Sequence, residues 1–517
     1  MKKRNNPHHL GLSILLMVIV AFASCQDNWD EHYNRDVVGK SDSGLFDYIA
    51  SQEDLSYFAE MLFITGYDSV LNAGQVYTVW APTNDALSTV FFPNINDMKL
   101  FVENHICWFS KPVRDADDQI ITTLNNKRLL FTKGADGFLY DNRHIAKSDI
   151  ALRNGIVHVL DGYVPYRLNL WEYLLQAEGF ESLQAYVNSL FEYELDGEAS
   201  FDGNGILIDS VMKVTNPILT LLGDLNLEDS TYTMIMPNED AWNEGLELTK
   251  SYFKTLEEDG GEEVQEANAK WTMVKDLIYR ERLKVPYADT VVYSTYGTNM
   301  GLPDSLFFDK TFEELSNGYA YTATHYPFKA IPTWHKEIRI EAEDNQGNTR
   351  LPNNYTLVNT SSVGTNVEAS GKAFVTAIPK TMNRISQLFI RFPIPNTLSA
   401  KYNIYAVFIP SSVIDKNDKR PYKVSFTLTY VGPTGRLVKD AKMSDKVVTD
   451  STNVTKVLVA ENFSFPYSNI VSMPGLTGSE TATVNIRIKN ETGVTAEEMA
   501  NFNRTIRVDC IILEPVQ

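Results

Sequence analysis

The sequence predicts an α+β protein in which one mixed domain occurs twice and an all-β sandwich follows. The repeat rests on two matching segments, YTVWAPTNDAL from Tyr77 and YTMIMPNEDAW from Tyr232. In each, a strand-like run reaches a proline and a polar cluster, and a helix start follows. After residue 335, alternating strand-like segments replace the helical patterns. A length of 517 residues fits three domains.

The N-terminus predicts a lipoprotein signal peptide over residues 1–24. Basic residues at positions 2–4 precede an apolar run over 14–23, which is shorter than the about 20 residues of a membrane-spanning helix. The run ends in Ala-Ser-Cys, which resembles a bacterial lipobox. That resemblance implies cleavage before Cys25 and lipidation of its thiol, so that acyl chains anchor the protein. The alternative is an ordinary signal peptide followed by an incidental cysteine.

Residues 25–40 are expected to form an acidic tether. The segment QDNWDEHY directly follows Cys25. It resembles the export signals that place lipoproteins of Bacteroidetes-type bacteria on the outer face of the outer membrane. This resemblance implies a lipid-anchored protein exposed at the cell surface. A flexible, solvated linker is compatible with the same residues.

The first copy of the repeated domain is expected over residues 41–167. Its strand ends just before Thr83, which can cap the following helix, and Asp85 suits the positive end of that helix. A closing strand signal, NGIVHVLDG, begins at Asn154, and Asn-Gly opens a tight turn because both residues tolerate positive φ. The candidate fold residues of this copy are Trp80, Pro82, Thr83, Asn84, Gly155 and His158.

The second copy is expected over residues 168–335. Pro237 and Asn238 stand where the first copy has its proline and helix cap, and LWEYL matches the earlier LFDYI. The closing segment from Asn317 is more degenerate and lacks the histidine. An acidic stretch, residues 257–263, lacks the alternating pattern of a calcium loop and is interpreted as a solvated loop.

These motifs resemble those of the fasciclin (FAS1) family, in which a Thr-x-Phe-Ala-Pro-Thr-Asn-x-Ala-Phe-like strand end precedes a late Asn-Gly-x-Ile-His-x-Ile-Asp-like strand. Trp80 replaces the usual Phe, and Leu87 stands at the second aromatic position. The second copy lacks the Ala before its proline and the late His. The resemblance covers residues 41–335. It implies a compact α/β domain built on a β-sandwich wedge with flanking helices, and adhesion or binding rather than catalysis.

A β-sandwich is predicted for residues 336–517, because strand signals separated by turns fill this region. Its closing strand and the Glu-Ala-Glu segment at 341–343 resemble jelly-roll, galactose-binding or carbohydrate-binding folds. Sugars usually pack on exposed aromatic rings, yet no Trp follows Trp334. Tyrosines would have to serve instead, and core packing is the favoured interpretation of each tyrosine.

Charge and cysteines exclude some functions. The net charge of −20 repels phosphates, so we expect no nucleic-acid partner. Apart from Cys25, the chain has only Cys107 and Cys510, in different expected domains. Buried thiols are therefore favoured over a disulfide.

Catalytic signatures are absent from the sequence: it has no serine elbow, phosphate loop, metalloprotease helix or Cys-x-x-Cys pair. We therefore expect no enzyme, no cofactor and no metal site. His158 is interpreted as a packed or hydrogen-bonded residue of a structural strand, and no ligand-binding residue is assigned.

Three functions remain. The favoured one is a non-enzymatic outer-membrane surface lipoprotein that binds a ligand or partner protein. It would act in adhesion or as an accessory subunit of a SusC/SusD-type nutrient uptake system, with a glycan or a peptide as ligand. The alternative is a structural spacer that presents a C-terminal glycan-binding module. A hydrolase with an unrecognised pair of carboxylates ranks last.

Overall fold

A computed structural model describes residues 41–201, 205–284, 291–302, 304–308, 310–344, 350–382, 384–385, 387–471 and 473–517. The predicted signal peptide, the tether and Cys25 lie outside these residues. The chain divides into two compact units, Met1–Leu168 and Asn169–Gln517. In the part of the chain that the structure describes, none of the helices combines the length and the apolar character that crossing a membrane requires.

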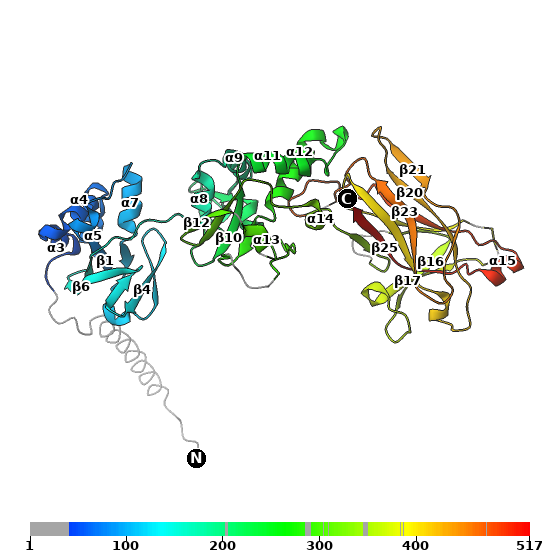
Figure 1. Ribbon diagram of the computed structural model, residues 1–517, viewed down its shortest axis with the longest axis horizontal. Coiled ribbons are helices and arrows are strands. Elements are labelled where there is room, and N and C mark those ends of the chain that lie inside the picture. Colours follow the sequence, from blue (N-terminus) through cyan, green and yellow to red (C-terminus); the bar gives the residue numbers. More distant parts are fainter. Residues whose placement is uncertain are drawn as a thin grey trace, which may run out of the picture. The chain divides into compact units, whose positions relative to one another are not determined.

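The first unit is built on a seven-stranded sheet of order β2-β1-β7-β6-β5-β4-β3, with helices beside it (Figure 1). We call residues 41–168 the first α/β part. Its strands are β1 (Tyr77–Pro82), β2 (Ile106–Trp108), β3 (Gln119–Thr122), β4 (Arg128–Gly134), β5 (Gly137–Tyr140), β6 (Arg143–Leu152) and β7 (Gly155–Leu160). Its helices are α3 (Leu45–Ser51), α4 (Ser56–Ile64), α5 (Tyr67–Asn72), α6 (Asn84–Leu87) and α7 (Ile95–Glu103).

The second unit begins with the second α/β part, residues 169–335, whose main sheet has the order β11-β10-β13-β12. Its strands are β8 (Glu192–Leu195), β9 (Met212–Thr215), β10 (Tyr232–Pro237), β11 (Ile278–Arg280), β12 (Thr311–Leu315) and β13 (Gly318–Ala323). Its helices are α8 (Leu170–Gln176), α9 (Glu181–Ser189), α10 (Gly197–Ser200), α11 (Glu239–Lys250), α12 (Gly261–Val274), α13 (Asp304–Phe307) and α14 (Ala330–Thr333). Strands β8 and β9 form a separate hairpin.

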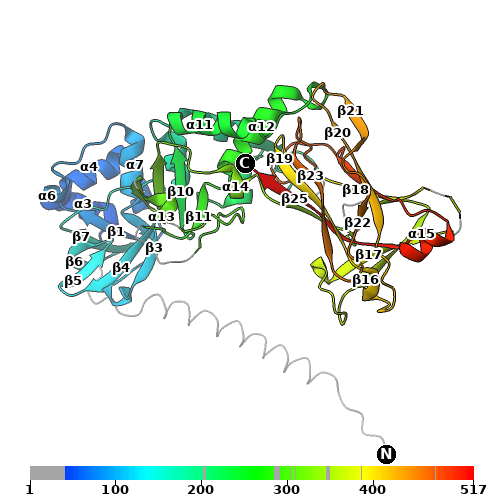
Figure 2. The same cartoon turned by 45° about the vertical axis from the view of Figure 1, so that its right-hand side comes forward.

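The remainder of the second unit, the C-terminal part (residues 336–517), contains two sheets that share one hydrophobic core (Figures 1 and 2). The first has the order β16-β17-β25-β19-β23, with β14 paired to β25, and the second has the order β15-β18-β24-β20-β21, with β22 paired to β20. The strands are β14 (Ile338–Glu341), β15 (Leu351–Asn353), β16 (Tyr355–Ser361), β17 (Ala373–Pro379), β18 (Leu388–Pro393), β19 (Lys401–Phe408), β20 (Lys423–Val431), β21 (Leu437–Lys442), β22 (Val447–Val448), β23 (Thr455–Ser464), β24 (Asn485–Asn490) and β25 (Ile506–Val516), and one helix is α15 (Ala496–Asn501).

Alternation along the strands builds this core. In β24, for example, Ile486 and Ile488 are fully buried between the sheets, while Asn485 and Arg487 point to the opposite face. Tyr355, Tyr402 and Tyr422 are also buried. These tyrosines therefore pack inside rather than offering rings to a ligand, as the favoured interpretation of the sequence held.

The two α/β parts share one strand register. In the first, β1 runs parallel to β7, and in the second, β10 runs parallel to β13. Tyr77 lies opposite Gly155, and Tyr232 lies opposite Gly318. Each pairing continues for six residues to the proline that ends the strand. The matching segments of the sequence thus take the same place in two similar sheets.

The expected solvated loop at residues 257–263 is wrong. Glu257–Asp259 form a short 3-10 helix, and α12 starts at Gly261. Glu262 and Glu263 lie in the first turn of α12, where the positive end of the helix dipole stabilises carboxylates. The acidic composition that suggested a solvated loop therefore marks a helix start.

Hydrogen bonds join the second α/β part to the C-terminal part within the second unit. The Asn268 side chain donates to the Thr477 carbonyl at 2.8 Å and accepts from the Thr477 N–H at 2.7 Å. Trp271 is buried, and a Cβ on Gly475 would lie 1.9 Å from its ring. Close backbone approach at Gly475 therefore requires a residue without a side chain.

Candidate functional site

The sequence-predicted fold residues of the first α/β part lie in its interior. The Trp80 ring is fully buried and stacks on Tyr140 with a centroid distance of 4.0 Å. His158 lies 5.8 Å from the same indole ring. Pro82 ends β1 and pairs with Leu160. These side chains fill the core and offer no surface to a ligand.

The helix-capping residues act as backbone anchors. The Thr83 hydroxyl accepts from the Ala86 N–H at 3.3 Å, and the Asn238 side chain accepts from the Ala241 N–H at 3.0 Å. Asn84 has a different role, because its side chain accepts from the Tyr57 N–H at 2.9 Å. Pro237 ends β10.

Gly155 is required by backbone packing. A Cβ at this position would lie 1.9 Å from the Tyr77 carbonyl oxygen, and the backbone has a φ of +154°. In the second α/β part, a Cβ on Gly318 would lie 2.0 Å from the Tyr232 carbonyl oxygen. Both glycines therefore permit the close approach of the paired strands.

A groove lined by both polar and apolar side chains lies on the outer face of the second sheet of the C-terminal part. One recess of about 600 Å³ is lined by residues of β15, β18, β20, β21 and β24 and of the segment 480–482. A second recess of about 450 Å³ lies on β20 and β24 and the segment 444–446. We call the two recesses together the groove. Its side chains are those that strand alternation turns away from the core.

Strand register places a row of polar side chains across the groove. Arg391 on β18 and Thr427 on β20 both lie opposite Arg487 on β24. Asp440 on β21 joins them: its carboxylate accepts from Arg391 Nη2 at 2.6 Å and from the Thr427 hydroxyl at 3.1 Å. Arg391 Nη1 also donates to Asn485 Oδ1 at 3.0 Å. The row is therefore fixed by its own hydrogen bonds.

An aromatic ring lies beneath both guanidinium groups. Arg487 lies over the Phe389 ring with 4.1 Å from its central carbon to the ring centroid, and Arg391 does so at 5.5 Å. Cation–π attraction adds to the hydrogen bonds that orient the two arginines. Hydrogen bonding from Arg391 holds the pKa of Asp440 below its usual value, so this carboxylate stays ionised.

The second recess repeats the arrangement of two cations around one acid. Glu491 accepts from Lys489 Nζ at 2.8 Å and from the Ser425 hydroxyl at 2.8 Å. Lys446 Nζ lies 3.8 Å from the same carboxylate. Burial opposes ionisation of Glu491, but the hydrogen bonds from Lys489 and Ser425 keep its pKa below the ordinary value.

Sequence reasoning did not find the groove residues. The central row of the groove, Arg391, Thr427, Asp440 and Arg487, comes from four strands between residues 388 and 490 and meets only through sheet pairing. A signal did exist, because Arg391, Thr427 and Arg487 all occupy outward positions of strands with apolar inward positions. To find the groove from the sequence, one would have had to know the strand order of the sheet and follow these outward positions across it.

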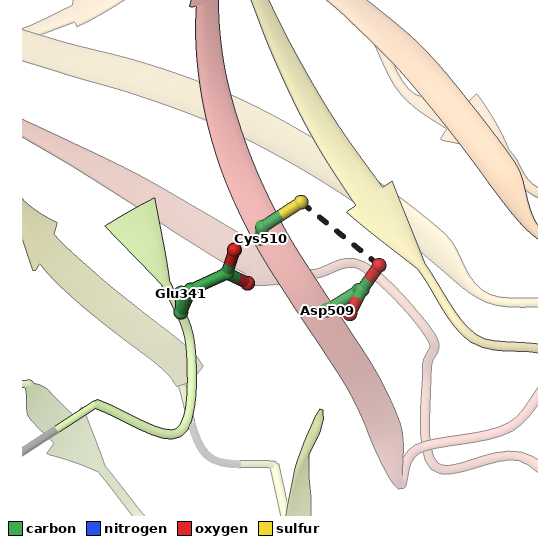
Figure 3. A group of neighbouring side chains, drawn as sticks. All are labelled: Glu341, Asp509 and Cys510. Atoms are coloured by element: carbon green, nitrogen blue, oxygen red, sulfur yellow. Dashed lines mark hydrogen bonds between the residues drawn. The ribbon is translucent and has the colours of Figure 1, made fainter. Parts of the chain in front are cut away.

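A group of acidic side chains lies elsewhere, between β14 and β25 (Figure 3). Glu341 is paired across the strands with Cys510, and Asp509 is the residue before it. One possible ligand atom from each of the three lies within 4.8 Å of the others. The backbone N–H of Ser370 donates to Asp509 at 3.3 Å, and the Ser370 hydroxyl donates to Glu341 at 2.6 Å.

Asp509 is buried and Glu341 is half-buried, and the carboxylates of this region are incompletely paired. Among the described residues, no hydrogen bond reaches Glu341 Oε2, Glu343 Oε2 or Asp509 Oδ1. Burial, with the nearby carboxylates, raises the pKa of Asp509 to about 7. Such oxygens suit a hard cation such as Ca²⁺. Burial raises the pKa of the Cys510 thiol to about 12, which disfavours the thiolate that a soft metal needs. Glu341 and Asp509 are therefore the carboxylates placed to hold a cation together.

Comparisons with solved structures give low structural similarity. A FAS1 domain pair from the insect cell adhesion molecule fasciclin I matches with 12% identity and a TM-score of 0.21, over 54% of this chain and 98% of that one. A Paenibacillus xanthan lyase matches with 14% identity and a TM-score of 0.22, over 39% of this chain and 16% of that one. The C-terminal family 22 carbohydrate binding module of Clostridium thermocellum Xyn10B matches with 11% identity and a TM-score of 0.20, over 34% of this chain and 92% of that one.

Comparison with curated proteins gives no match. The family comparison gives one, to the Fasciclin domain model over residues 53–164. This range begins at the 3-10 turn before α4 and ends just after β7, so it contains the Trp80–Pro82 strand end and His158. Residues 53–164 of this chain are a fasciclin domain.

Proposed function

We propose that the protein is a non-enzymatic surface lipoprotein whose C-terminal part binds a carbohydrate in the groove. The groove itself carries the proposal. It combines about 600 Å³ and about 450 Å³ of recess with guanidinium, carboxylate, amide and hydroxyl groups that hold one another in position. Sugars present hydroxyl groups that both donate and accept, so a preorganised set of mixed polar groups suits them.

The shape of the groove favours an extended ligand over a compact one. Its two recesses lie side by side across β18, β24, β20 and β21, and Arg487 in one forms an ion pair with Asp440 in the other at 3.7 Å. A polysaccharide chain laid across these strands would contact both recesses. We infer a β-sandwich of the jelly-roll kind as the scaffold that presents this face.

Binding without catalysis fits Asp440 and Glu491, the two groove carboxylates that hydrogen-bond to basic side chains. A glycoside hydrolase needs one carboxyl group with a raised pKa to act as general acid. Asp440 and Glu491 instead have lowered pKa values, because basic side chains hydrogen-bond to both. Neither is suited to donate a proton near neutral pH, which supports a binding role.

The second α/β part is, on this proposal, a second fasciclin-like domain. Its strand register, its proline strand end and its crowded glycine all correspond to those of the first α/β part. Two such domains before the groove would hold it away from the membrane, which also accommodates the alternative of a spacer. Adhesion through the fasciclin surfaces remains part of the proposal.

Anchoring by Cys25 at the outer membrane completes the proposal. Lipidation at this residue, followed by the acidic tether, would display the groove outside the cell. There it would serve adhesion or deliver a glycan to a SusC/SusD-type transporter. Radiolabelled fatty acid should enter the wild-type protein in its native host and fail to enter the Cys25→Ala variant. Equal labelling of both would exclude this anchor.

Affinity electrophoresis of the unlipidated full chain in gels containing neutral and acidic polysaccharides tests carbohydrate binding. Asn485→Ala removes an amide that lines the groove and hydrogen-bonds Arg391. It should weaken binding roughly fivefold, as expected for one hydrogen bond of about 1 kcal/mol. Asn403→Ala, on the other sheet, is the matched control because Asn403 bonds only the neighbouring strand in the contacts described for it. Migration unaffected by every polysaccharide would refute the proposal.

A further inference from the structure

The centre of the groove has more positive than negative charge. Arg391 and Arg487 share the single carboxylate of Asp440, at 2.6 Å and 3.7 Å. Only the shorter contact is a hydrogen bond. Arg391 is therefore neutralised by Asp440, while Arg487 keeps most of its charge available.

Arg487 also has unused donors. Its side chain is only 15% exposed, yet among the described residues its Nε finds no hydrogen-bond acceptor. Nη2 makes one long hydrogen bond, 3.3 Å to Gln387 Oε1. A guanidinium that is largely removed from water needs acceptors for its donors, because an unpaired buried charge is costly. Because Nε itself is buried, an acceptor that arrives with a ligand would have to meet the part of the Arg487 side chain that remains exposed.

The second recess also has more positive than negative charge. Lys489 and Lys446 share Glu491, at 2.8 Å and 3.8 Å. Lys439 and Glu480 line the first recess as well, and their charges offset each other. Two points along the groove therefore have two cations around one acid, and a polymer with repeated negative charges could meet both.

The charge of the C-terminal part sets it apart from the rest of the chain. Residues 336–517 contain 21 Lys and Arg against 17 Asp and Glu, a net charge of +4. The other 335 residues contain the remaining 25 Lys and Arg against 49 Asp and Glu, a net charge of −24. An anionic ligand is attracted to the C-terminal part and repelled elsewhere, which guides it to this face.

We propose that the ligand of the groove is an acidic glycan, and that Arg487 receives its carboxylate or sulfate group. This inference rests on the proposed function and names the class of glycan. A planar guanidinium binds such groups through two parallel hydrogen bonds, and these are stronger than bonds between neutral groups. Asp440 and Glu491 keep their neighbouring cations in place, while the hydroxyl and amide groups of the groove bind the neutral positions of the sugar ring.

The test uses the unlipidated full chain with polygalacturonate, chondroitin sulfate and neutral xylan as probes in affinity gels and calorimetry. Polygalacturonate or chondroitin sulfate should bind at least roughly tenfold more tightly than xylan, with affinity that falls as salt rises. Arg487→Gln should weaken this binding roughly tenfold or more. Arg487→Lys keeps the charge without the paired hydrogen bonds, so its affinity should lie between those of the wild type and Arg487→Gln. Lys456→Gln, on the other sheet and paired with Glu514, should bind like the wild type.

The outcomes separate this inference from the proposed function. Tight binding of either acidic polymer that Arg487→Gln weakens supports both, and binding of polygalacturonate shows that a carboxylate is sufficient. Binding of xylan alone, unchanged by salt, overturns the inference while the carbohydrate-binding proposal stands. No binding of any polysaccharide overturns both. Thermal unfolding of each variant shows whether it is folded. If Arg487→Gln does not fold, the comparison of polysaccharide binding by Arg487→Lys and by the wild type tests the inference instead.

Discussion

Asn154 and Asn317 occupy the same position in the two α/β parts and make the same contacts. Asn154 Oδ1 accepts from the Leu45 N–H at 3.0 Å, and Asn317 Oδ1 accepts from the Leu170 N–H at 2.8 Å. Each therefore satisfies the first N–H of the helix that opens its part, α3 or α8. Each side chain also donates to a carbonyl group that precedes the central strand, that of Leu71 in the last turn of α5 in one case and that of Leu225 in the other.

Asn317→Ala should destabilise the second unit by about 3 kcal/mol. The substitution leaves the Leu170 N–H and the Leu225 and Leu227 carbonyls without their buried partner, and each such group costs about 1–3 kcal/mol. Chemical denaturation of the full chain measures the change. Asn188→Ala, at an exposed position in α9, is the control and should change stability little. Equal stability of both variants would show that the Asn317 contacts do not matter.

Gly155→Ala should disrupt the pairing of β1 with β7. The added methyl group would lie 1.9 Å from the Tyr77 carbonyl oxygen, and this backbone atom cannot move without breaking the sheet. We expect a loss of roughly 3 kcal/mol or more, at the upper end for overpacked sites. Gly74→Ala is a matched control, because a Cβ there has no described neighbour within 4 Å. A Gly155→Ala protein with wild-type melting would contradict the strand register.

The sequence could predict the two matching strand ends because their signals are local. A strand, a proline and a capping residue follow one another directly, so Pro82 with Thr83 and Pro237 with Asn238 identify the strand ends without any long-range information. Asn154 and Asn317 belong to the Asn-Gly signals that close the copies. Their turn chemistry was evident in the sequence, whereas their contacts to distant helices were not.

The groove and the acidic group could not be predicted in the same way. Arg391, Asp440 and Arg487 meet only because β18, β24, β20 and β21 are neighbours in an order unlike their order in the sequence. Glu341 and Asp509 are brought together by the pairing of the first and last strands of the C-terminal part. Such contacts depend on strand order, which hydrophobic alternation does not specify.

The fasciclin domain should lose stability as the pH falls from 6.5 to 4. The ring of His105 has one N near the Phe101 carbonyl at 2.8 Å, and its other N accepts from the Val164 N–H at 3.1 Å. The ring is completely buried, and this burial lowers the pKa of His105 to about 4. Burial also lowers the pKa of His158. Between pH 6.5 and pH 4 the histidine is protonated in the unfolded chain but stays neutral in the folded domain. The stability present above pH 6.5 is therefore lost as the pH falls toward 4.

Urea denaturation at pH 7 and pH 4.5 measures this effect. A shift from the ordinary value of 6.5 to about 4 corresponds to roughly 3 kcal/mol for His105 across the full range. His105→Gln lowers stability at pH 7 but should remove part of the difference between the two pH values. His325→Gln, at a side chain 87% exposed, should leave the difference unchanged. The same pH difference in wild type and His105→Gln would rule out His105 as a cause.

Ca²⁺ should raise the unfolding temperature of the C-terminal part if the acidic group holds a cation. Three buried carboxylate oxygens, on Glu341, Glu343 and Asp509, lack hydrogen bonds among the described residues. A cation bound between Glu341 and Asp509 would offset the repulsion between these two carboxylates. At a concentration one hundred times the dissociation constant, it would stabilise the fold by about 2.7 kcal/mol.

Asp509→Asn should abolish this response, while Asp445→Asn, at an exposed carboxylate paired with Lys442, should keep it. If millimolar Ca²⁺ and EDTA leave the wild-type unfolding temperature equal, Asp509 is instead protonated, as its raised pKa permits.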